Sequence, residues 1–158
     1  MENQVVHLTR EGFQKFESEL NYLRSVRRGE LAERLRLALE EGGDLVENAE
    51  FEDAKNEQAF VEGRIQYLEM LLNRAEIMED SEATSSGTVG LNSVVTVKED
   101  GEKAEKFHIV GAAEADPRLG RISDVSPLGR ALMGHQVGDK VVVSAPDGSF
   151  TYKIVAVE

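Results

Sequence analysis

Carboxylates gather in one short stretch of the chain, where two of them are spaced to share a divalent cation. Residues 40–53 contain seven Asp and Glu and no Lys or Arg. Asp44 and Glu47 follow Gly42 and Gly43, a glycine pair that breaks helices and lets a chain reverse. If a helix begins there, the two carboxylates lie on one face, about 5–6 Å apart at Cβ. Oxygen ligands so placed suit Mg²⁺.

The same spacing also has a purely structural interpretation. Asp followed three residues later by Glu is close to a capping box, and acidic side chains favour the positive end of a helix dipole. Spacing alone leaves both interpretations open. Two carboxylates would leave Mg²⁺ mostly hydrated and weakly held, so a metal-binding pair makes sense as ligands donated to another protein's phosphodiester site. On this argument the chain donates ligands and is not itself an enzyme.

Composition restricts the partners that such a stretch can have. The chain has 158 residues, a formal net charge of −12 and no cysteine. Non-specific nucleic-acid binding needs clustered Lys and Arg, so any nucleic acid must be held by another protein. The N-terminus lacks the features of a signal peptide, and no apolar run is long enough to span a membrane. We expect a cytoplasmic protein without disulfides.

Heptad-like apolar patterns on both sides of the acidic stretch predict a helical hairpin with the carboxylates at its tip. The first helix is expected over residues 10–40 and the return helix over residues 44–77. In the first helix the apolar stripe resumes one residue out of phase after Arg27, Arg28 and Glu30. The apolar positions are Phe13, Phe16, Leu20 and Leu23, then Leu31, Leu35 and Ala38, and on the return helix Val61, Ile65, Leu68, Leu72 and Ala75.

The second half of the chain has the period of strands. A small polar linker is expected over residues 80–87, which separates a hairpin domain (1–79) from a sheet domain (88–158). Strands are expected over 89–97, 106–110, 121–123, 137–144 and 150–157, with one short helix after Ser126 and Pro127. The fold class is therefore α+β, with a small antiparallel sheet in the second domain.

Other residues with chemical potential are scattered or ambiguous. His7, His108 and His135 have no metal-ligand spacing with one another. Five arginines cluster on the first helix: Arg24, Arg27, Arg28, Arg34 and Arg36. They either pair with glutamates at i,i+4 on an exposed face or form a stripe that guides a negatively charged strand towards the tip.

Three motifs stand in the chain in a defined order and spacing. The first half contains Leu8, Thr9 and Gly12 at its start and Ser25-Val26-Arg27-Arg28 in its first helix. The tip sequence is Gly43-Asp44-Leu45-Val46-Glu47-Asn48-Ala49-Glu50-Phe51, and the second half contains Ser126 to Gly134 with Val137-Gly138-Asp139. Together these motifs resemble those of bacterial Gre factors, the transcript cleavage factors of RNA polymerase, nearest their GreA branch. The resemblance covers the whole chain.

The resemblance implies a function for both halves. A coiled coil would enter the polymerase secondary channel, and an FKBP-like domain would dock at the channel rim through Ser126, Pro127 and Leu128. Asp44 and Glu47 would hold a Mg²⁺ jointly with polymerase and stimulate endonucleolytic cleavage of backtracked RNA. The protein would be monomeric when free, and its contacts with RNA or polymerase would include Arg34, Arg36, Asn48, Phe51 and Lys55.

Departures from the family pattern keep alternatives open. Gly29 stands where the family often has Pro, Gly42 replaces a His, and Val46 replaces a basic or polar residue. A less polar tip could lower cleavage activity. The first alternative is therefore a channel binder that inhibits or modulates polymerase without cleaving. The second is a prolyl isomerase in residues 88–158, which would need an aromatic-lined pocket.

Overall fold

The chain folds into two compact units. The computed structural model describes residues 4–41, 48–79 and 86–158. One unit, the hairpin unit, is Phe13–Arg74; the other, the sheet unit, combines Met1–Gly12 with Ala75–Glu158. The domain ranges expected from sequence stay a prediction.

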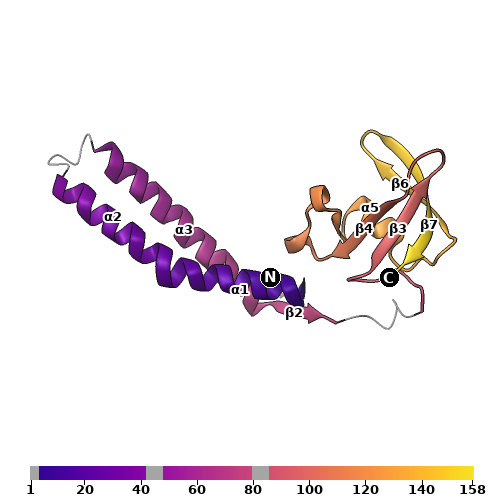
Figure 1. Cartoon of the computed structure of the whole chain (residues 1–158), viewed down its shortest axis with the longest axis horizontal. Coiled ribbons are helices and arrows are strands. Elements are labelled where there is room, and N and C mark those ends of the chain that lie inside the picture. Colours follow the sequence, from indigo (N-terminus) through magenta and orange to yellow (C-terminus); the bar gives the residue numbers. More distant parts are fainter. Residues whose placement is uncertain (1–3, 42–47, 80–85) are drawn as a thin grey trace. The chain divides into compact units, whose positions relative to one another are not determined.

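Two long antiparallel helical segments form the hairpin unit. The first runs without a break through α1 (Arg10–Tyr22), η1 (Leu23–Arg27) and α2 (Arg28–Glu41), and α3 (Ala49–Asn73) returns beside it (Figure 1). The first helix expected over residues 10–40 is thus confirmed. None of the helices in the described part of the chain combines the length and apolar character that membrane crossing requires.

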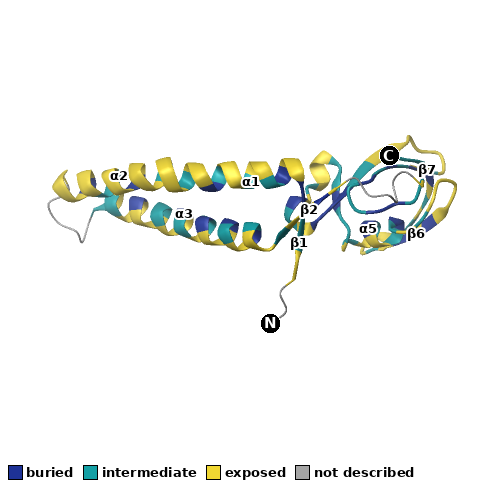
Figure 2. Cartoon of the chain, turned by 90° about the horizontal axis from the view of Figure 1, so that it is seen from below, coloured by how far each residue is buried: buried dark blue, intermediate teal, exposed yellow. Residues whose placement is uncertain are grey.

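A single seam of apolar side chains joins the two helical segments. Buried positions lie along the facing sides and leave the outer sides exposed (Figure 2). The seam residues below 9 % exposure are Leu20, Leu31 and Ala38 on the outgoing segment, and Ala54, Val61, Ile65, Leu68 and Leu71 on α3. Towards the tip the seam narrows to the alanines Ala38 and Ala54, so apolar burial contributes least there.

A π-helical turn explains the phase shift in the first helix. In η1 the Arg28 N–H donates to the Leu23 carbonyl, an i→i+5 bond that accommodates one extra residue. The extra residue restores the register of the stripe, because Leu20 before it and Leu31 after it are both buried. The one-residue offset in the sequence therefore marks a local change of helix type, and the helix continues through it.

A short parallel strand pair takes the place of the expected end of the return helix. The α3 helix ends at Asn73, four residues before the predicted end, and β2 (Ala75–Met78) pairs in parallel with β1 (Val6–Thr9). Leu8 and Met78 are buried in this pair. Residues 75–78 continue the helical spacing by only one apolar position, and strand pairing overrides that weak local preference.

The larger sheet has five strands in the order β5-β4-β3-β7-β6. Its strands are β3 (Val94–Glu99), β4 (Glu105–Val110), β5 (Arg121–Ser123), β6 (Lys140–Ala145) and β7 (Gly148–Val157). The α+β class and the strands of the sheet domain are confirmed. The sheet is mixed, however, because β5 runs parallel to β4. The first strand also starts later than expected, because residues before it form a turn in which the Gly90 N–H donates to Ser93 Oγ at 3.0 Å.

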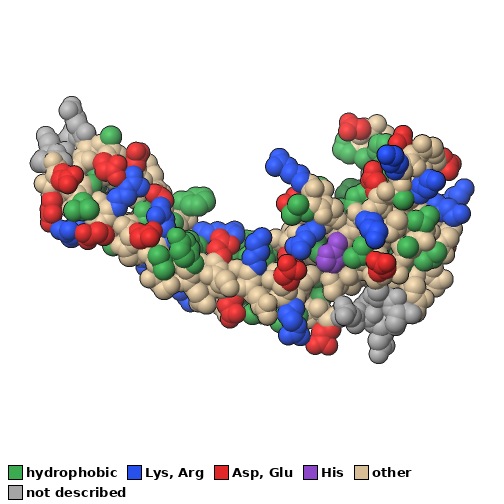
Figure 3. All heavy atoms as spheres, in the orientation of Figure 1, with side chains coloured by type: hydrophobic (Ala, Val, Ile, Leu, Met, Phe, Trp, Pro, Cys, Tyr) green, Lys and Arg blue, Asp and Glu red, His purple; other side chains and the backbone are tan. Residues whose placement is uncertain are grey.

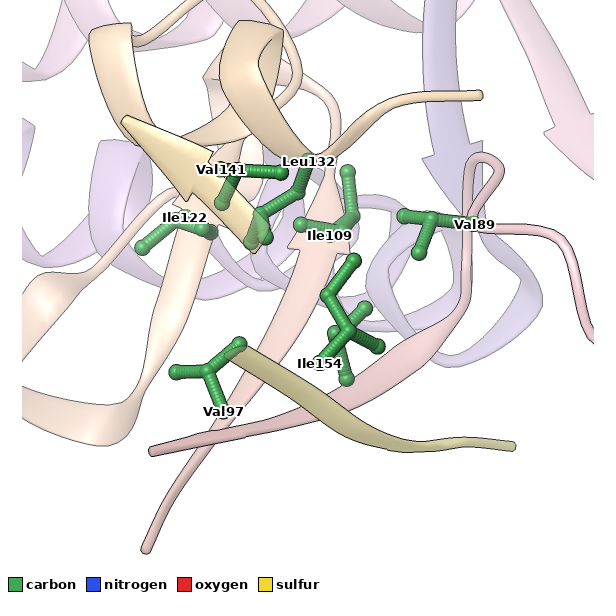
Figure 4. Packing of buried hydrophobic residues seen from close by; sticks show 8 residues of the cluster. Val89, Val97, Ile109, Ile122, Leu132, Val141 and Ile154 are labelled. Atoms are coloured by element: carbon green, nitrogen blue, oxygen red, sulfur yellow. The ribbon is translucent and has the colours of Figure 1, made fainter. Parts of the chain in front are cut away.

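The core of the sheet unit lies between the sheet and the helix α5 (Pro127–Leu132), as Figure 4 shows. Eight side chains form the core: Val89, Val95, Val97, Ile109, Ile122, Leu132, Val141 and Ile154. The short helix has the predicted ends, with Ser126 as N-cap and Pro127 in its first turn. Gly134 follows with a positive φ of 79°.

Candidate functional site

The helix that follows the acidic stretch begins at a different residue from the one expected. Asn48 is the N-cap of α3, and its side-chain Oδ1 accepts the Phe51 N–H at 3.0 Å. The first turn of α3 is therefore formed by Ala49 to Glu52, and the capping-box interpretation of Asp44 falls on residues that the structure does not describe. Asp44 and Glu47 themselves lie outside the described residues, so their predicted shared site stays a prediction.

Asn48 also ties the two helical segments together at the base of the tip. Its Nδ2 donates to the Ala38 carbonyl of α2 at 2.7 Å. One amide side chain thus satisfies a free N–H at the start of α3 and a carbonyl near the end of α2. The residue directly after Glu47 is consequently fixed to both helices.

Arg34 of α2 adds ion pairs with α3 beside this hydrogen-bonded bridge. Its guanidinium donates to Glu50 and, at 2.7 Å, to Glu57, both on α3. The bond to Glu50 raises the pKa of Arg34, and in return Arg34 lowers the pKa of Glu50. Near the tip, where the apolar seam is thin, Asn48 and Arg34 supply the main described polar links between the segments.

The arginine cluster is fully paired in the structure. Arg36 contacts Glu33 and Glu40 within its own helix, which raises its pKa. The other pairs of the cluster cross the hairpin, apart from Arg27–Glu30: Arg24–Glu69, Arg27–Glu57, Arg28–Glu62, Arg34–Glu50 and Arg34–Glu57. Figure 3 shows basic and acidic side chains intermixed along the hairpin. Pairing is thus the observed role, mostly across the hairpin and at i,i+4 only for Arg36–Glu40, while a guiding role for the stripe stays a prediction.

Phe51 and Lys55 lie one turn apart at the start of α3. The Lys55 ammonium is 5.7 Å from the centre of the Phe51 ring, within the range of a cation–π contact. Phe51 is half-buried and Lys55 is exposed. The sequence-predicted contact residues Arg34, Asn48, Phe51 and Lys55 therefore all lie close to the tip, with Arg36 facing Glu33 and Glu40.

The metal-binding potential of the tip rests on the acidic stretch itself. No cluster of three or more His, Asp or Glu able to hold an ion occurs among the described residues. At the described edges of the stretch, Glu40 and Glu50 are already paired with arginines. Asp44 and Glu47 provide hard oxygen donors, which is the chemistry that Mg²⁺ prefers.

Family comparison decides what kind of protein carries this tip. The family described as "Transcription elongation factor, N-terminal" matches residues 6–77, and "Transcription elongation factor, GreA/GreB, C-term" matches residues 84–158. The chain belongs to the GreA/GreB family of transcription elongation factors. The sequence-based recognition of a Gre factor is therefore confirmed.

Named relatives agree with this assignment over nearly the whole chain. The chain is 48 % identical to the transcription elongation factor GreA of Clostridium novyi over 151 residues, 95 % of this chain and 94 % of the relative. It is also 48 % identical to the GreA of Chloroflexus aurantiacus over 158 residues, 99 % of each. A solved structure of GreA factor homolog 1 (Gfh1) from Thermus thermophilus is 33 % identical, covers 98 % of this chain and 99 % of its own, and has a TM-score of 0.45.

The Gre motif in the sheet unit has a structural role of its own. Ser126 Oγ accepts the Gly129 N–H at 3.0 Å and donates to the Ser123 carbonyl at 2.6 Å, and Leu128 packs against the core cluster. Pro127 is exposed. The motif thus builds α5 and presents Pro127 to solvent, and the predicted docking role of these residues stays a prediction.

The departures from the Gre pattern fall mostly beyond what the structure describes. Gly42 and Val46 lie outside the described residues. Gly29 lies in α2, and a Cβ placed on it would meet nothing within 4 Å. The helix continues through this glycine, so the departure leaves the first segment of the hairpin intact.

A polar cleft of about 580 Å³ opens on the sheet unit of this Gre factor. Arg10, Glu11, Glu79, His108 and Arg121 contribute charged or titratable side chains to it. Burial, together with nearby Arg121, lowers the pKa of His108. No Phe, Tyr or Trp is among the described residues that line the cleft. The prolyl isomerase alternative, which needs an aromatic pocket, gains no support from it.

Sequence reasoning missed the structural roles of two polar residues. Asn48 was expected only as a contact residue, although an Asn directly before an amphipathic helix is a recognisable cap signal. Glu114 was not singled out at all, yet only 8 % of its surface is exposed. Nothing local in the sequence around Glu114 indicates a buried carboxylate, because Thr9, whose N–H and hydroxyl donate to it, lies 105 positions away in the chain.

Proposed function

We propose that this Gre factor inserts its helical hairpin into the secondary channel of RNA polymerase and stimulates cleavage of backtracked RNA. Asp44 and Glu47 are the residues that act at the reacting phosphodiester. The observation that supports this proposal most directly is the Asn48 bridge, which fixes the residue after Glu47 to α2 as well as α3. A ligand pair anchored beside such a bridge loses less freedom when it reaches its target.

The proposed cofactor is a Mg²⁺ held jointly with polymerase. Asp44 and Glu47 fit this ion by donor chemistry, and their small number explains why the hairpin alone would hold it weakly. When bound, the ion would activate water and neutralise charge at the scissile phosphate. The chain's own carboxylates would orient that ion and accept hydrogen bonds from its water ligands.

Other residues of the chain hold the tip or the docked complex in place. Arg34 keeps α2 and α3 together near the tip through its ion pairs with Glu50 and Glu57. Lys55 is exposed and, unlike the arginine cluster, forms no ion pair within the described part of the chain, so it is free to meet RNA phosphate. Pro127 and its neighbours Ser126 and Leu128 would dock at the channel rim.

The net charge of the chain supports a mechanism in which polymerase holds the RNA and the factor contributes the carboxylates. With a net charge of −12 the free protein repels nucleic acid, so the RNA must be held by polymerase while the tip approaches its 3′ end. The protein would act as a monomer wherever polymerase works, in the cytoplasm.

A cleavage assay tests the proposal. A stalled, backtracked elongation complex carries 3′-labelled RNA and Mg²⁺, and released 3′ fragments are measured with wild-type protein or with the double variant Asp44→Asn/Glu47→Gln. We expect the double variant to bind polymerase normally but to lose stimulation by at least about a hundredfold, because neutral amides are poor Mg²⁺ ligands. Fragment release that survives in the double variant would refute the assigned roles of Asp44 and Glu47.

A matched control removes the same charge nearby. Glu52 and Asp53 are exposed carboxylates in the first turns of α3 and have no ion-pair partner among the described residues. Glu52→Gln/Asp53→Asn should therefore keep near wild-type stimulation. If wild-type protein binds polymerase but releases no fragments, the chain is instead a channel binder that modulates polymerase without cleaving.

A further inference from the structure

A second polar cluster lies where β1 passes into α1. Thr9 is positioned as the N-cap of α1, and its Oγ1 accepts the Gly12 N–H at 2.9 Å. This contact is one half of a capping box. The other half needs a carboxylate or amide on the third helical residue to accept the N–H of the cap residue. Here that third residue is Gly12, which has no side chain.

Glu114 of the same unit, far from Thr9 in the sequence, supplies the missing half. Its Oε2 accepts the Thr9 N–H at 2.7 Å, and its Oε1 accepts the Thr9 hydroxyl at 2.6 Å. The two residues are 105 positions apart in the chain. One carboxylate thus satisfies both donors of the cap residue.

Glu114 also occupies the space that a side chain on the third helical residue would fill. A Cβ built on Gly12 would lie 2.0 Å from Glu114 Oε1 and 2.4 Å from its Cδ. Gly12 and Glu114 are therefore complementary, because the absence of one side chain makes room for the other.

The surroundings make the carboxylate an obligatory acceptor. Only 2 % of the Glu114 side chain is exposed, and a buried carboxylate is costly without hydrogen bonds. The positive end of the α1 dipole lies at the cap, and Arg121 Nη1 is 3.9 Å from Oε1. The interactions with the N-terminus of α1 therefore offset the cost of removing the Glu114 carboxylate from water.

The backbone around Glu114 is packed as closely as its side chain. Glu114 ends the short turn η3 (Ala112–Glu114) between β4 and β5, and Gly111 precedes that turn. A Cβ on Gly111 would lie 2.2 Å from the carbonyl oxygen of His7 in β1. The β1 strand therefore meets η3 at two successive places, through backbone at His7 and through hydrogen bonds at Thr9.

We infer that Glu114 completes the N-cap of α1 from a distant part of the chain and is the positioning residue that holds the start of α1 against η3. The helical run that ends at the tip starts at this cap, so its first turn can form fully only when the sheet has folded. The structural part of this inference is independent of the proposed function, and its effect on cleavage rests on that function.

Amide hydrogen exchange and thermal unfolding of the full chain test the structural part. Glu114→Ala leaves the Thr9 N–H without its acceptor, so exchange at Thr9 should accelerate on the order of tenfold or more. The melting temperature should fall by roughly 4–8 °C. Unchanged protection of the Thr9 amide in this variant would overturn the inference.

Two glycine substitutions give matched steric controls. Gly12→Ala should destabilise the protein, because the new methyl group would collide with the Glu114 carboxylate. Gly63→Ala places the same methyl group in α3, where nothing lies within 4 Å, and should raise stability through better helix propensity. Equal effects of the two substitutions would count against a specific fit between Gly12 and Glu114.

A rescue variant separates capping from positioning. Gly12→Glu combined with Glu114→Ala creates the local pattern Thr-x-x-Glu, a capping box within α1 itself. This double variant should regain protection at Thr9 and much of the lost melting temperature, even if Glu114→Ala alone does not fold. Failure of the double variant to regain either would overturn the assignment of Glu114 as a cap.

The cleavage assay then tests whether Glu114 acts as a positioning residue in addition to capping α1. Glu114→Ala and the rescue variant should both stimulate cleavage on the order of tenfold less than wild type, because in neither variant does a side chain of η3 hold the start of α1. Full recovery of cleavage by the rescue variant would show that Glu114 is only a cap. If wild-type protein itself stimulates no cleavage, the proposed function fails while the exchange experiment still decides the role of Glu114.

Discussion

At the scale of single residues, the Asn48 side chain makes two hydrogen bonds, one within α3 and one to α2. Its oxygen caps α3 at Phe51, and its nitrogen reaches the Ala38 carbonyl. Asn48→Ala removes both bonds and should cost about 1–2 kcal/mol in unfolding free energy, measured by urea denaturation. We also expect weaker cleavage at unchanged polymerase affinity, because the carboxylates before Asn48 lose their anchor.

The control for this prediction is another asparagine of the same helix. Asn56 is exposed and has no hydrogen-bond partner among the described residues. Asn56→Ala should leave stability within about 0.5 kcal/mol of wild type. A comparable loss at both positions would mean that Asn48 acts through helix propensity and not through its two bonds.

The chemistry of individual residues was predictable where it depended on type and spacing. The carboxylates Asp44 and Glu47 can be recognised from the sequence alone, because they follow a glycine pair within an acidic stretch. Glu114 does not stand out, because its importance comes from burial against Thr9 and Gly12, which only tertiary structure brings together. Long-range partners of this kind leave no periodic trace.

At the scale of elements, ion pairs join the two helical segments of the hairpin. Glu19 on α1 and Arg64 on α3 form a two-bond pair, with Nε–Oε1 at 2.7 Å and Nη2–Oε2 at 2.9 Å. The hydrogen bonds from Arg64 hold the pKa of Glu19 below the ordinary value of a glutamate. Side chains here are about one-third exposed, at 34 % each, so solvent weakens the pair.

The lowered pKa of Glu19 predicts how the stability of the protein changes with pH. The pair stabilises the folded state at neutral pH, and its contribution is lost as the pH falls through the folded-state pKa of Glu19, because the unfolded chain binds the proton more readily. Glu19→Gln should therefore destabilise the protein by about 0.5–1 kcal/mol at pH 7 and by less at pH 3. Urea denaturation at both pH values measures the difference.

A neighbouring glutamate provides the comparison. Glu17 is exposed on the same helix and has no ion pair within the described residues. Glu17→Gln should change stability little at either pH. A pH-independent loss in Glu19→Gln would contradict an origin in the Arg64 pair.

Elements were predictable from sequence where one local rule dominated. The heptad pattern gave the hairpin, and its one-residue offset coincides with the π-helical turn Leu23–Arg27. The parallel pair of β1 and β2 could not be foreseen, because each strand has only four residues and adjoins a long helix. The parallel placement of β5 beside β4 likewise depends on tertiary contacts between distant segments.

At the scale of the whole molecule, the chain has two cores with no residue in common. The hairpin seam includes Leu68, and the core of the sheet unit includes Leu132; both side chains are fully buried, at 0 % exposure. Each unit therefore has its own source of apolar stabilisation. Unfolding need not be a single two-state event in such a chain.

Matched leucine truncations in the two cores test this division. Leu68→Ala and Leu132→Ala each remove the same atoms from a buried site and should each cost about 2–5 kcal/mol. In differential scanning calorimetry, Leu68→Ala should lower the melting transition of the hairpin unit by roughly 10 °C or more and leave the transition of the sheet unit nearly unchanged. Leu132→Ala should do the reverse. A single transition that shifts equally in both variants would instead show that the two cores unfold cooperatively.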